Sequence, residues 1–100
     1  MLKITKTTEQ DKLTLIPAGR LDTMTAPELE AELKASLPGV TELTFDLKDL
    51  EYISSSGLRV LLSILKQAKS VGSRVVLKNV NEVIRDVLDI SGFISIFEME

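Results

Sequence analysis

A run of three serines and a glycine, Ser54–Gly57, carries the hydroxyl groups whose placement is most informative in this sequence. An apolar run typical of a strand precedes it, and the helical apolar pattern of Leu58–Ala68 follows it. A serine at the start of a helix can cap the free backbone N–H groups of the first turn. It can also accept a phosphate, whose roughly -1.5 to -2 charges a helix N-terminus tolerates. The residues alone leave both functions open.

Missing residue types exclude most enzymatic chemistry. The chain has no His and no Cys, which removes imidazole bases, thiol nucleophiles, hydrolytic triads with His and nearly all zinc sites. Asp46 and Asp49 are candidate catalytic carboxylates, but a receiver-type phospho-aspartate site needs an acidic cluster after the first strand, and residues 2–5 offer none. No glycine-rich phosphate loop with its lysine occurs. We therefore expect no enzymatic activity, no cofactor and no metal.

The composition predicts one globular domain over residues 1–100. Hydrophobic residues make up 44% of the chain and charged residues 27%, which allows one core built from Leu, Ile, Val and Ala. The net charge of -3 and the lack of a basic stripe argue against nucleic acid as a partner. The sequence has neither the apolar run of a signal peptide nor a stretch of membrane-spanning length. We expect a cytoplasmic monomer without membrane insertion.

The apolar pattern predicts eight elements in the order β-β-α-β-α-β-α-β. Strands are expected over residues 2–5, 13–16, 40–47, 74–80 and 93–97, and helices after Thr25, over residues 58–68 and after Asn81. Residues 19–24 are expected to form a loop, residues 48–53 a link, and Pro17 a strand end or sheet edge. The first two strands predict an antiparallel hairpin, and each strand–helix–strand unit predicts a parallel crossover. The expected fold class is α/β, a mixed β-sheet with helices packed against it.

Three loops are expected at the carboxyl edge of this sheet, because parallel crossovers place their strand-to-helix loops there. They span residues 19–24, 48–56 and 78–81, and the last of them carries Asn79 and Asn81. The topology therefore predicts that Asp22 and the serine run share one surface, although they lie far apart in the sequence. Asp22 suits either a turn or a contact with a partner.

Residues close to these loops have both structural and functional interpretations. Thr25 is expected to cap a helix, with Glu28 completing a capping box. Gly57 indicates a close approach of the backbone or a tight helix entry. Leu58 is expected in or near the core, although it can also be a contact residue. Arg59 is expected in solvent, where it can meet a partner or an added phosphate.

Two segments together resemble a known family. Residues 19–26, Gly-Arg-Leu-Asp-Thr-Met-Thr-Ala, and residues 46–61, which include Tyr-Ile-Ser-Ser-Ser-Gly-Leu-Arg, are similar to the STAS domain and to its stand-alone bacterial members, the anti-sigma factor antagonists. The resemblance implies the STAS fold. It also implies a partner, an anti-sigma factor that is a GHKL-type serine kinase. The unphosphorylated antagonist binds this partner and releases a sigma factor, the kinase phosphorylates a loop serine using ATP, and a phosphatase restores the active form.

The resemblance also implies roles for single residues. In the commonest family motif the acceptor serine follows an Asp, so the acceptor carries over to Ser55, while the Asp position is occupied by Ser54. This difference keeps Ser54 and Ser56 open as alternative acceptors. The residues expected to contact the partner are Asp22, Thr25, Ser54, Ser56, Gly57, Leu58 and Arg59.

Two other functions remain open at this point. One is a constitutive STAS subunit of a transporter or signalling complex that ignores phosphate, which the serine at position 54 favours. The other is a nucleotide binder or slow NTPase, as suggested for some STAS domains, and the missing phosphate loop argues against it.

Overall fold

The computed structural model describes residues 2–92 and 97–100 and contains three helices and a six-stranded sheet. The elements are β1 (Leu2–Glu9), β2 (Lys12–Leu21), α1 (Ala26–Ser36), β3 (Glu42–Asp46), β4 (Leu50–Ile53), α2 (Ser55–Ser70), β5 (Arg74–Lys78), α3 (Glu82–Ile90) and β6 (Glu98–Met99). The predicted α/β class is confirmed, as are the antiparallel β1–β2 hairpin and the parallel pairing of the later strands.

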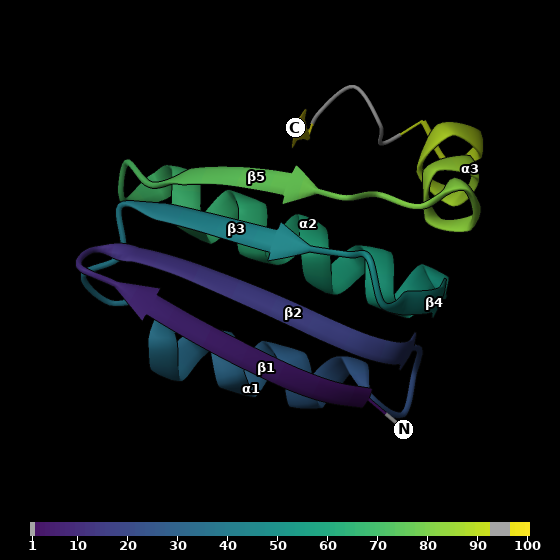
Figure 1. Cartoon of the computed structure of the whole chain (residues 1–100), viewed down its shortest axis with the longest axis horizontal. Coiled ribbons are helices and arrows are strands. Elements are labelled where there is room, and N and C mark those ends of the chain that lie inside the picture. Colours follow the sequence, from purple (N-terminus) through teal and green to yellow (C-terminus); the bar gives the residue numbers. More distant parts are fainter. Residues whose placement is uncertain (1, 93–96) are drawn as a thin grey trace.

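The sheet has the order β1-β2-β3-β5-β6, and β4 pairs with β2 beyond the end of β3. Figure 1 shows α1 and α2 together behind the sheet and α3 beyond the carboxyl ends of the parallel strands. The core between sheet and helices is rich in leucine, with Phe45 as its largest fully buried side chain. Its most buried members are Leu15, Leu29, Leu43, Leu77, Ile84, Leu88 and Ala68.

The second strand is longer than the predicted 13–16, since β2 continues through Pro17 to Leu21. Residues 12–15 pair with β3 and residues 19–21 pair with β4, so Pro17 lies between the two parallel ladders. The N–H of Gly19 and the carbonyl of Leu21 both point toward the segment that contains β4. With the two-residue period of a strand, the missing N–H of Pro17 falls on that same side, where no neighbouring strand is in register. The prediction that Pro17 ends the strand was wrong for this reason.

Strand β4 was predicted as part of a link. Its register with β2 shifts between Gly19 and Arg20, which leaves Glu51 as an extra residue on β4. The bulge places the two buried residues Leu50 and Ile53 three positions apart, with exposed residues between them. A bulge breaks the alternation that identifies a strand in sequence.

The other boundaries differ by small amounts. β1 runs on to Glu9, β3 and β5 are shorter than the predicted 40–47 and 74–80, and α2 begins three residues before Leu58. Asn81 caps α3 as expected, because its Oδ1 accepts a hydrogen bond from the N–H of Ile84 at 3.0 Å. Of the predicted final strand, residues 93–96 lie outside the described residues, and β6 is formed by residues 98–99.

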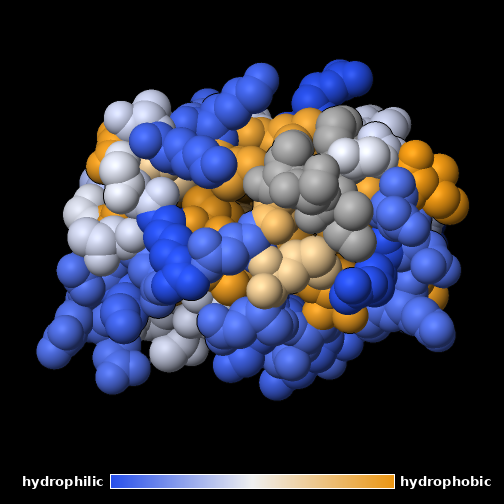
Figure 2. Space-filling model, turned by 90° about the horizontal axis from the view of Figure 1, so that it is seen from above, coloured by the Kyte–Doolittle hydropathy of each residue, from blue (hydrophilic) through white to orange (hydrophobic). Residues whose placement is uncertain are grey.

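The surface beside β5 and β6 is partly apolar. Figure 2, which looks onto the molecule from above, shows apolar atoms in a hollow framed by hydrophilic residues. A pocket of about 300 Å³ opens between α2, β5 and the C-terminal residues and is lined in part by Leu65, Val75 and Phe97. No helix among the described residues has the length and the apolar character needed to cross a membrane.

Candidate functional site

The serine run forms the junction between β4 and α2. Ser54 is the N-cap of α2, and its Oγ accepts a hydrogen bond from the N–H of Gly57 at 3.2 Å. The backbone N–H of Ser54 donates to the carbonyl of Leu21 at 2.9 Å, which ties the junction to the end of β2. The capping function that the sequence left open is therefore confirmed, and Ser54 performs it.

Gly57 lies where the first turn of α2 meets the end of β2. A Cβ atom at this position would sit 2.8 Å from both Cγ and the carbonyl oxygen of Leu21, and 3.0 Å from Cγ1 of Ile53. Such distances are shorter than real Cβ contacts, so only glycine fits without movement of the backbone. The predicted close approach is confirmed, and it brings the serine run against the loop that starts after Leu21.

Asp22 organises that loop through backbone hydrogen bonds. Its Oδ1 accepts from the N–H groups of Met24 at 3.0 Å and Thr25 at 3.1 Å. In return, Oγ1 of Thr25 accepts from the N–H of Asp22 at 2.9 Å and donates to the carbonyl of Arg20 at 2.8 Å. The predicted capping box was wrong, because Thr25 occupies the N-cap position of α1 without a side-chain capping bond. Its hydroxyl is turned back to Asp22 and Arg20 instead.

The hydrogen bonds to Asp22 also control its ionisation. Partial burial opposes the charged form, but the hydrogen bonds from the N–H groups of Thr25 and Met24, the Thr25 hydroxyl and the charge of Arg20 together outweigh it. The pKa of Asp22 therefore lies below its usual value, and the loop carries a full negative charge at neutral pH.

A direct contact joins the two loops. Oγ1 of Thr23 and Oγ of Ser56 are 3.1 Å apart and form a hydrogen bond in which either can donate. The prediction that Asp22 and the serine run share one surface is thus confirmed, and Thr23 is the residue that makes the connection. No function was predicted for Thr23 from the sequence, although its place next to Asp22 in the expected loop was a usable signal.

The three serine hydroxyls have different surroundings. Ser54 accepts from the N–H of Gly57, and Ser56 bonds to Thr23, and both residues are half-buried. Ser55 is the first residue of α2 and is exposed. Within residues 2–92 and 97–100, its hydroxyl has no hydrogen-bond partner. Ser55 is the one hydroxyl of the run that can react without breaking a bond within the described chain.

The other residues predicted to contact a partner divide into exposed and buried ones. Arg59 is exposed on α2, and Asp22 is half-buried. Thr25 and Leu58 are each only 6% exposed, and Gly57 is also buried. The last three lie beneath the surface in the free chain, where they support the loops. Their contact with a partner stays a prediction.

Three side chains for which the sequence predicted no function of their own add to this surface. Met24 is 83% exposed, which is unusual for a large apolar residue. Arg20 lies over the ring of Tyr52, with its guanidinium carbon 4.3 Å from the ring centroid, and the two residues are paired across β2 and β4. Nε of Arg20 is 3.8 Å from Oδ2 of Asp22. The surface around Ser55 therefore combines apolar, cationic and anionic groups.

The third loop of the carboxyl edge is held by asparagines. Nδ2 of Asn79 donates to Oδ1 of Asp46 at 3.1 Å, and Nδ2 of Asn81 donates to the carbonyl of Leu50 at 2.7 Å. Asp46 is buried and also accepts from the N–H of Lys48 at 3.2 Å. These contacts give Asp46 a structural function.

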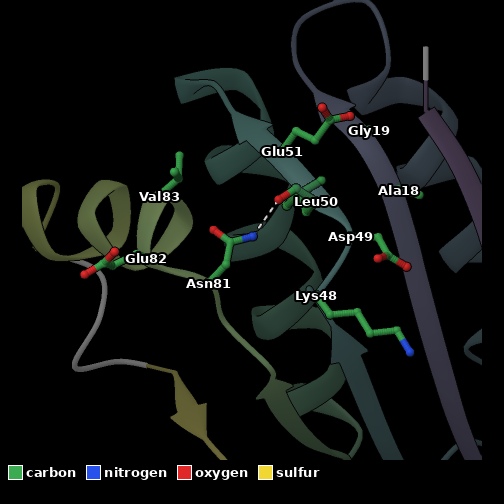
Figure 3. A pocket seen from close by; sticks show the side chains of 9 residues that line it. All are labelled: Ala18, Gly19, Lys48, Asp49, Leu50, Glu51, Asn81, Glu82 and Val83. Carbon is green, nitrogen blue, oxygen red and sulfur yellow. Dashed lines mark hydrogen bonds between the residues drawn. The ribbon is translucent and has the colours of Figure 1, made fainter.

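An open groove of about 700 Å³ lies between this loop and β2 (Figure 3). Figure 3 shows Glu82 and Val83 on its α3 side and Lys48 and Asp49 on the opposite side. Its full lining is Ala18, Gly19, Lys48, Asp49, Leu50, Glu51, Asn81, Glu82 and Val83. Among the residues that the structure describes, no group of three acidic side chains is placed to hold a metal ion.

The family model of the STAS domain matches residues 3–100. The chain belongs to the STAS domain family. Its relatives include BtrV of Bordetella bronchiseptica, named as an anti-sigma factor antagonist, with 44% identity over 79% of this chain and 69% of that protein. The anti-sigma-B factor antagonist of Bacillus subtilis is 32% identical over 82% of this chain and 75% of that one. The resemblance seen in the sequence is confirmed, and this STAS domain groups with the anti-sigma factor antagonists.

Solved structures agree in fold. An anti-sigma factor antagonist from Thermotoga maritima superposes with a TM-score of 0.87 at 23% identity, over 96% of this chain and 84% of that chain. The unphosphorylated form of the antagonist SpoIIAA gives a TM-score of 0.76 at 18% identity, over 100% of this STAS domain and 87% of SpoIIAA. At these identities the likeness concerns the fold.

Proposed function

We propose that this STAS domain is a phosphorylation-controlled anti-sigma factor antagonist. In the unphosphorylated state it binds an anti-sigma factor that is a GHKL-type serine kinase, and a sigma factor is released. Phosphorylation of Ser55 ends the binding, and a phosphatase restores the active form. The chain acts as a monomeric substrate and binder in the cytoplasm, without enzymatic activity of its own.

The observation that carries the proposal is the different engagement of the three serine hydroxyls. Ser54 is used as a cap and Ser56 is bonded to Thr23, whereas Ser55 is exposed at the start of α2 without a partner in the described chain. This arrangement supports Ser55 over the two alternatives that the sequence left open. The relatives support the general role, because they are named as anti-sigma factor antagonists.

The position of Ser55 also explains how a phosphate can act without unfolding the chain. The first residues of α2 present free N–H groups and the positive end of the helix dipole, which favour an added anion. The phosphate adds roughly -1.5 to -2 charges to a surface that already holds ionised Asp22. A partner that docks on this surface with apolar or acidic groups meets a repulsive charge, while the fold tolerates it.

The first test is the charge at position 55. Ser55→Glu is expected to abolish binding to the kinase partner, measured by calorimetry, while its circular dichroism and urea midpoint stay close to those of the wild type. Ser55→Gln has nearly the same size without the charge and serves as the matched control, with binding largely retained. Full affinity in Ser55→Glu would sink the proposal and would be the behaviour of a constitutive STAS scaffold subunit.

The second test locates the phosphate. After incubation with the kinase and ATP, phosphopeptide mass spectrometry is expected to find the phosphate on Ser55. A signal confined to Ser54 or Ser56 contradicts the assignment. Calorimetry with ATP or GTP in the absence of kinase is expected to give no heat, and a clear binding isotherm would favour the nucleotide-binding alternative.

A further inference from the structure

The hydrogen bond between Thr23 and Ser56 joins two loops at the surface of the junction, where one exposed hydrogen bond contributes only modestly to the stability of the fold. It does, however, engage one of two neighbouring serines that a kinase can reach. Ser55 and Ser56 are adjacent in the first turn of α2, and only Ser56 has a hydroxyl partner among the described side chains. The contact therefore distinguishes two acceptors that the sequence does not.

The backbone that carries Thr23 is firmly held. The residues on both sides of it are joined by the reciprocal hydrogen bonds of Asp22 and Thr25, and the hydroxyl of Thr25 reaches back to Arg20 in β2. The N–H of Ala26 also donates to the carbonyl of Asp22 at 2.8 Å. Thr23 therefore stands on a closed turn, and its β-branched side chain has only χ1 to fix for the hydroxyl to keep one position.

The backbone that carries Ser56 is fixed as well. Ser54 caps the turn on one side of it, and Gly57 on the other side is packed against Leu21 so closely that no Cβ fits. Because both partners stand on fixed backbones, the 3.1 Å separation between Thr23 Oγ1 and Ser56 Oγ follows from the packing of α2 on β2.

We propose that Thr23 is a specificity determinant that restricts phosphoryl transfer to Ser55 by occupying the hydroxyl of Ser56. This inference rests on the proposed function. In the transfer, a bond forms between the serine Oγ and the terminal phosphorus of ATP, and the bond from that phosphorus to ADP breaks. The hydroxyl proton leaves to a base of the kinase or to water. If Ser56 donates to Thr23, the proton that has to leave is engaged; if it accepts, one of the two lone pairs of its Oγ is engaged and the oxygen is a weaker nucleophile. In either case transfer to Ser56 is slower than transfer to the unengaged hydroxyl of Ser55.

The test compares Thr23→Val, which keeps the shape of the side chain and loses the hydroxyl, with Thr23→Ser, which keeps the hydroxyl. Each chain is incubated with the GHKL-type kinase and ATP, and the ratio of phosphate on Ser56 to phosphate on Ser55 is measured by mass spectrometry. Thr23→Val is expected to raise this ratio roughly two- to tenfold, the factor that one net hydrogen bond corresponds to. Thr23→Ser is expected to keep the wild-type ratio.

A second background removes competition between the two acceptors. With Ser55→Ala present, Thr23→Val is expected to raise the initial rate of phosphorylation at Ser56 by the same factor. An unchanged ratio in Thr23→Val, or a Thr23→Ser variant that behaves like it, overturns the inference and leaves phosphorylation of Ser55 intact. Absence of phosphate from all three serines in the wild-type chain overturns the proposed function, and this inference with it. Urea midpoints of the variants confirm that they are folded.

Discussion

The two edges of the sheet are held together by different kinds of contact. At the carboxyl edge, where the serine run lies, the loops are joined by hydrogen bonds from hydroxyl, amide and backbone groups, such as those of Ser54 with Gly57 and Thr23 with Ser56. At the amino edge, charged side chains form a row across neighbouring strands. Arg74 of β5 bonds to Glu42 of β3 at 3.0 Å and to Glu98 of β6.

The carboxyl edge therefore depends mainly on the geometry of its hydrogen bonds, whereas the amino edge depends on attraction between charges. The hydrogen bonds of the carboxyl edge join residues close in the sequence or loops whose separation is fixed by packing. Most of them have at least one neutral partner, so salt, which screens interactions between charges, should affect them little. The charge row is exposed, and exposed ion pairs weaken as ionic strength rises. The surface around Ser55 has to keep its shape when a serine gains a phosphate. Hydrogen bonds with a neutral partner suit such a surface better than exposed ion pairs, because a new charge perturbs them less.

The largest expected effect at the carboxyl edge comes from Gly57→Ala. The new Cβ would lie 2.8 Å from the carbonyl oxygen of Leu21, which also accepts from the N–H of Ser54, so the junction has to move. Overpacking of this kind costs ~1–3 kcal/mol, and contact with backbone places this variant at the upper end of the range. Urea denaturation monitored by circular dichroism measures the loss.

Gly72→Ala is the matched control at the other end of α2. Nothing lies within 4 Å of its Cβ position, and its φ of +80° leaves only the strain of the left-handed region, about 1–2 kcal/mol. A cost of Gly57→Ala that is no greater than that of Gly72→Ala contradicts the steric account of the junction.

An intermediate effect is expected for Ser54→Ala. The variant leaves the N–H of Gly57 without its capping acceptor, and loss of a serine N-cap typically costs ~1 kcal/mol. The urea midpoint should fall by a similar amount at low and at high salt, because the cap is a neutral group. Ser54→Asp keeps an acceptor oxygen in place and adds a charge that the helix dipole favours, so it should retain the wild-type midpoint. Equal destabilisation by both substitutions argues against the capping function of Ser54.

Much of the carboxyl edge was predictable from sequence, because it follows from topology. Once the alternation of strands and helices is recognised, the loops that contain Asp22 and Ser55 must emerge on the same side. The caps at Ser54 and Asn81 were predictable as well, since they depend only on local chemistry. These features need no knowledge of how side chains pack.

The remaining features depend on contacts between distant segments. Strand β4 exists because β2 is long enough to pair with two successive strands, and the bulge at Glu51 hides its pattern. Thr25 and Glu28 have the spacing of a capping box. The hydroxyl of Thr25 instead accepts from the N–H of Asp22 and donates to the carbonyl of Arg20, so it does not cap α1. The hydrogen bond between Thr23 and Ser56 forms only because packing brings the two loops to their observed separation. No residue spacing in the sequence predicts that separation.

The smallest effect, and the one that sharpens the contrast with the carboxyl edge, is expected for Glu98→Gln in the charge row. The hydrogen bond from Arg74, together with its positive charge, outweighs partial burial and lowers the pKa of Glu98 below its usual 4.5. A carboxyl whose pKa is lower in the folded state stabilises the fold above the unfolded pKa, and this contribution disappears as the pH falls through the folded value. Wild-type stability at low salt should therefore drop below about pH 4.5, and Glu98→Gln should show a shallower drop.

Thermal unfolding between pH 3 and 7, about the range that brackets this titration, measures the difference at low salt and again near 1 M salt, where screening should reduce it. Asp86→Asn, on the exposed surface of α3 and outside the charge row, is the matched control and should change the acid limb less than Glu98→Gln does. The salt dependence of Glu98→Gln should also exceed that of Ser54→Ala. If the two variants respond equally to salt, the distinction between an amino edge held by a charge row and a carboxyl edge held mainly by hydrogen bonds does not hold, because both edges then depend on charge to the same extent.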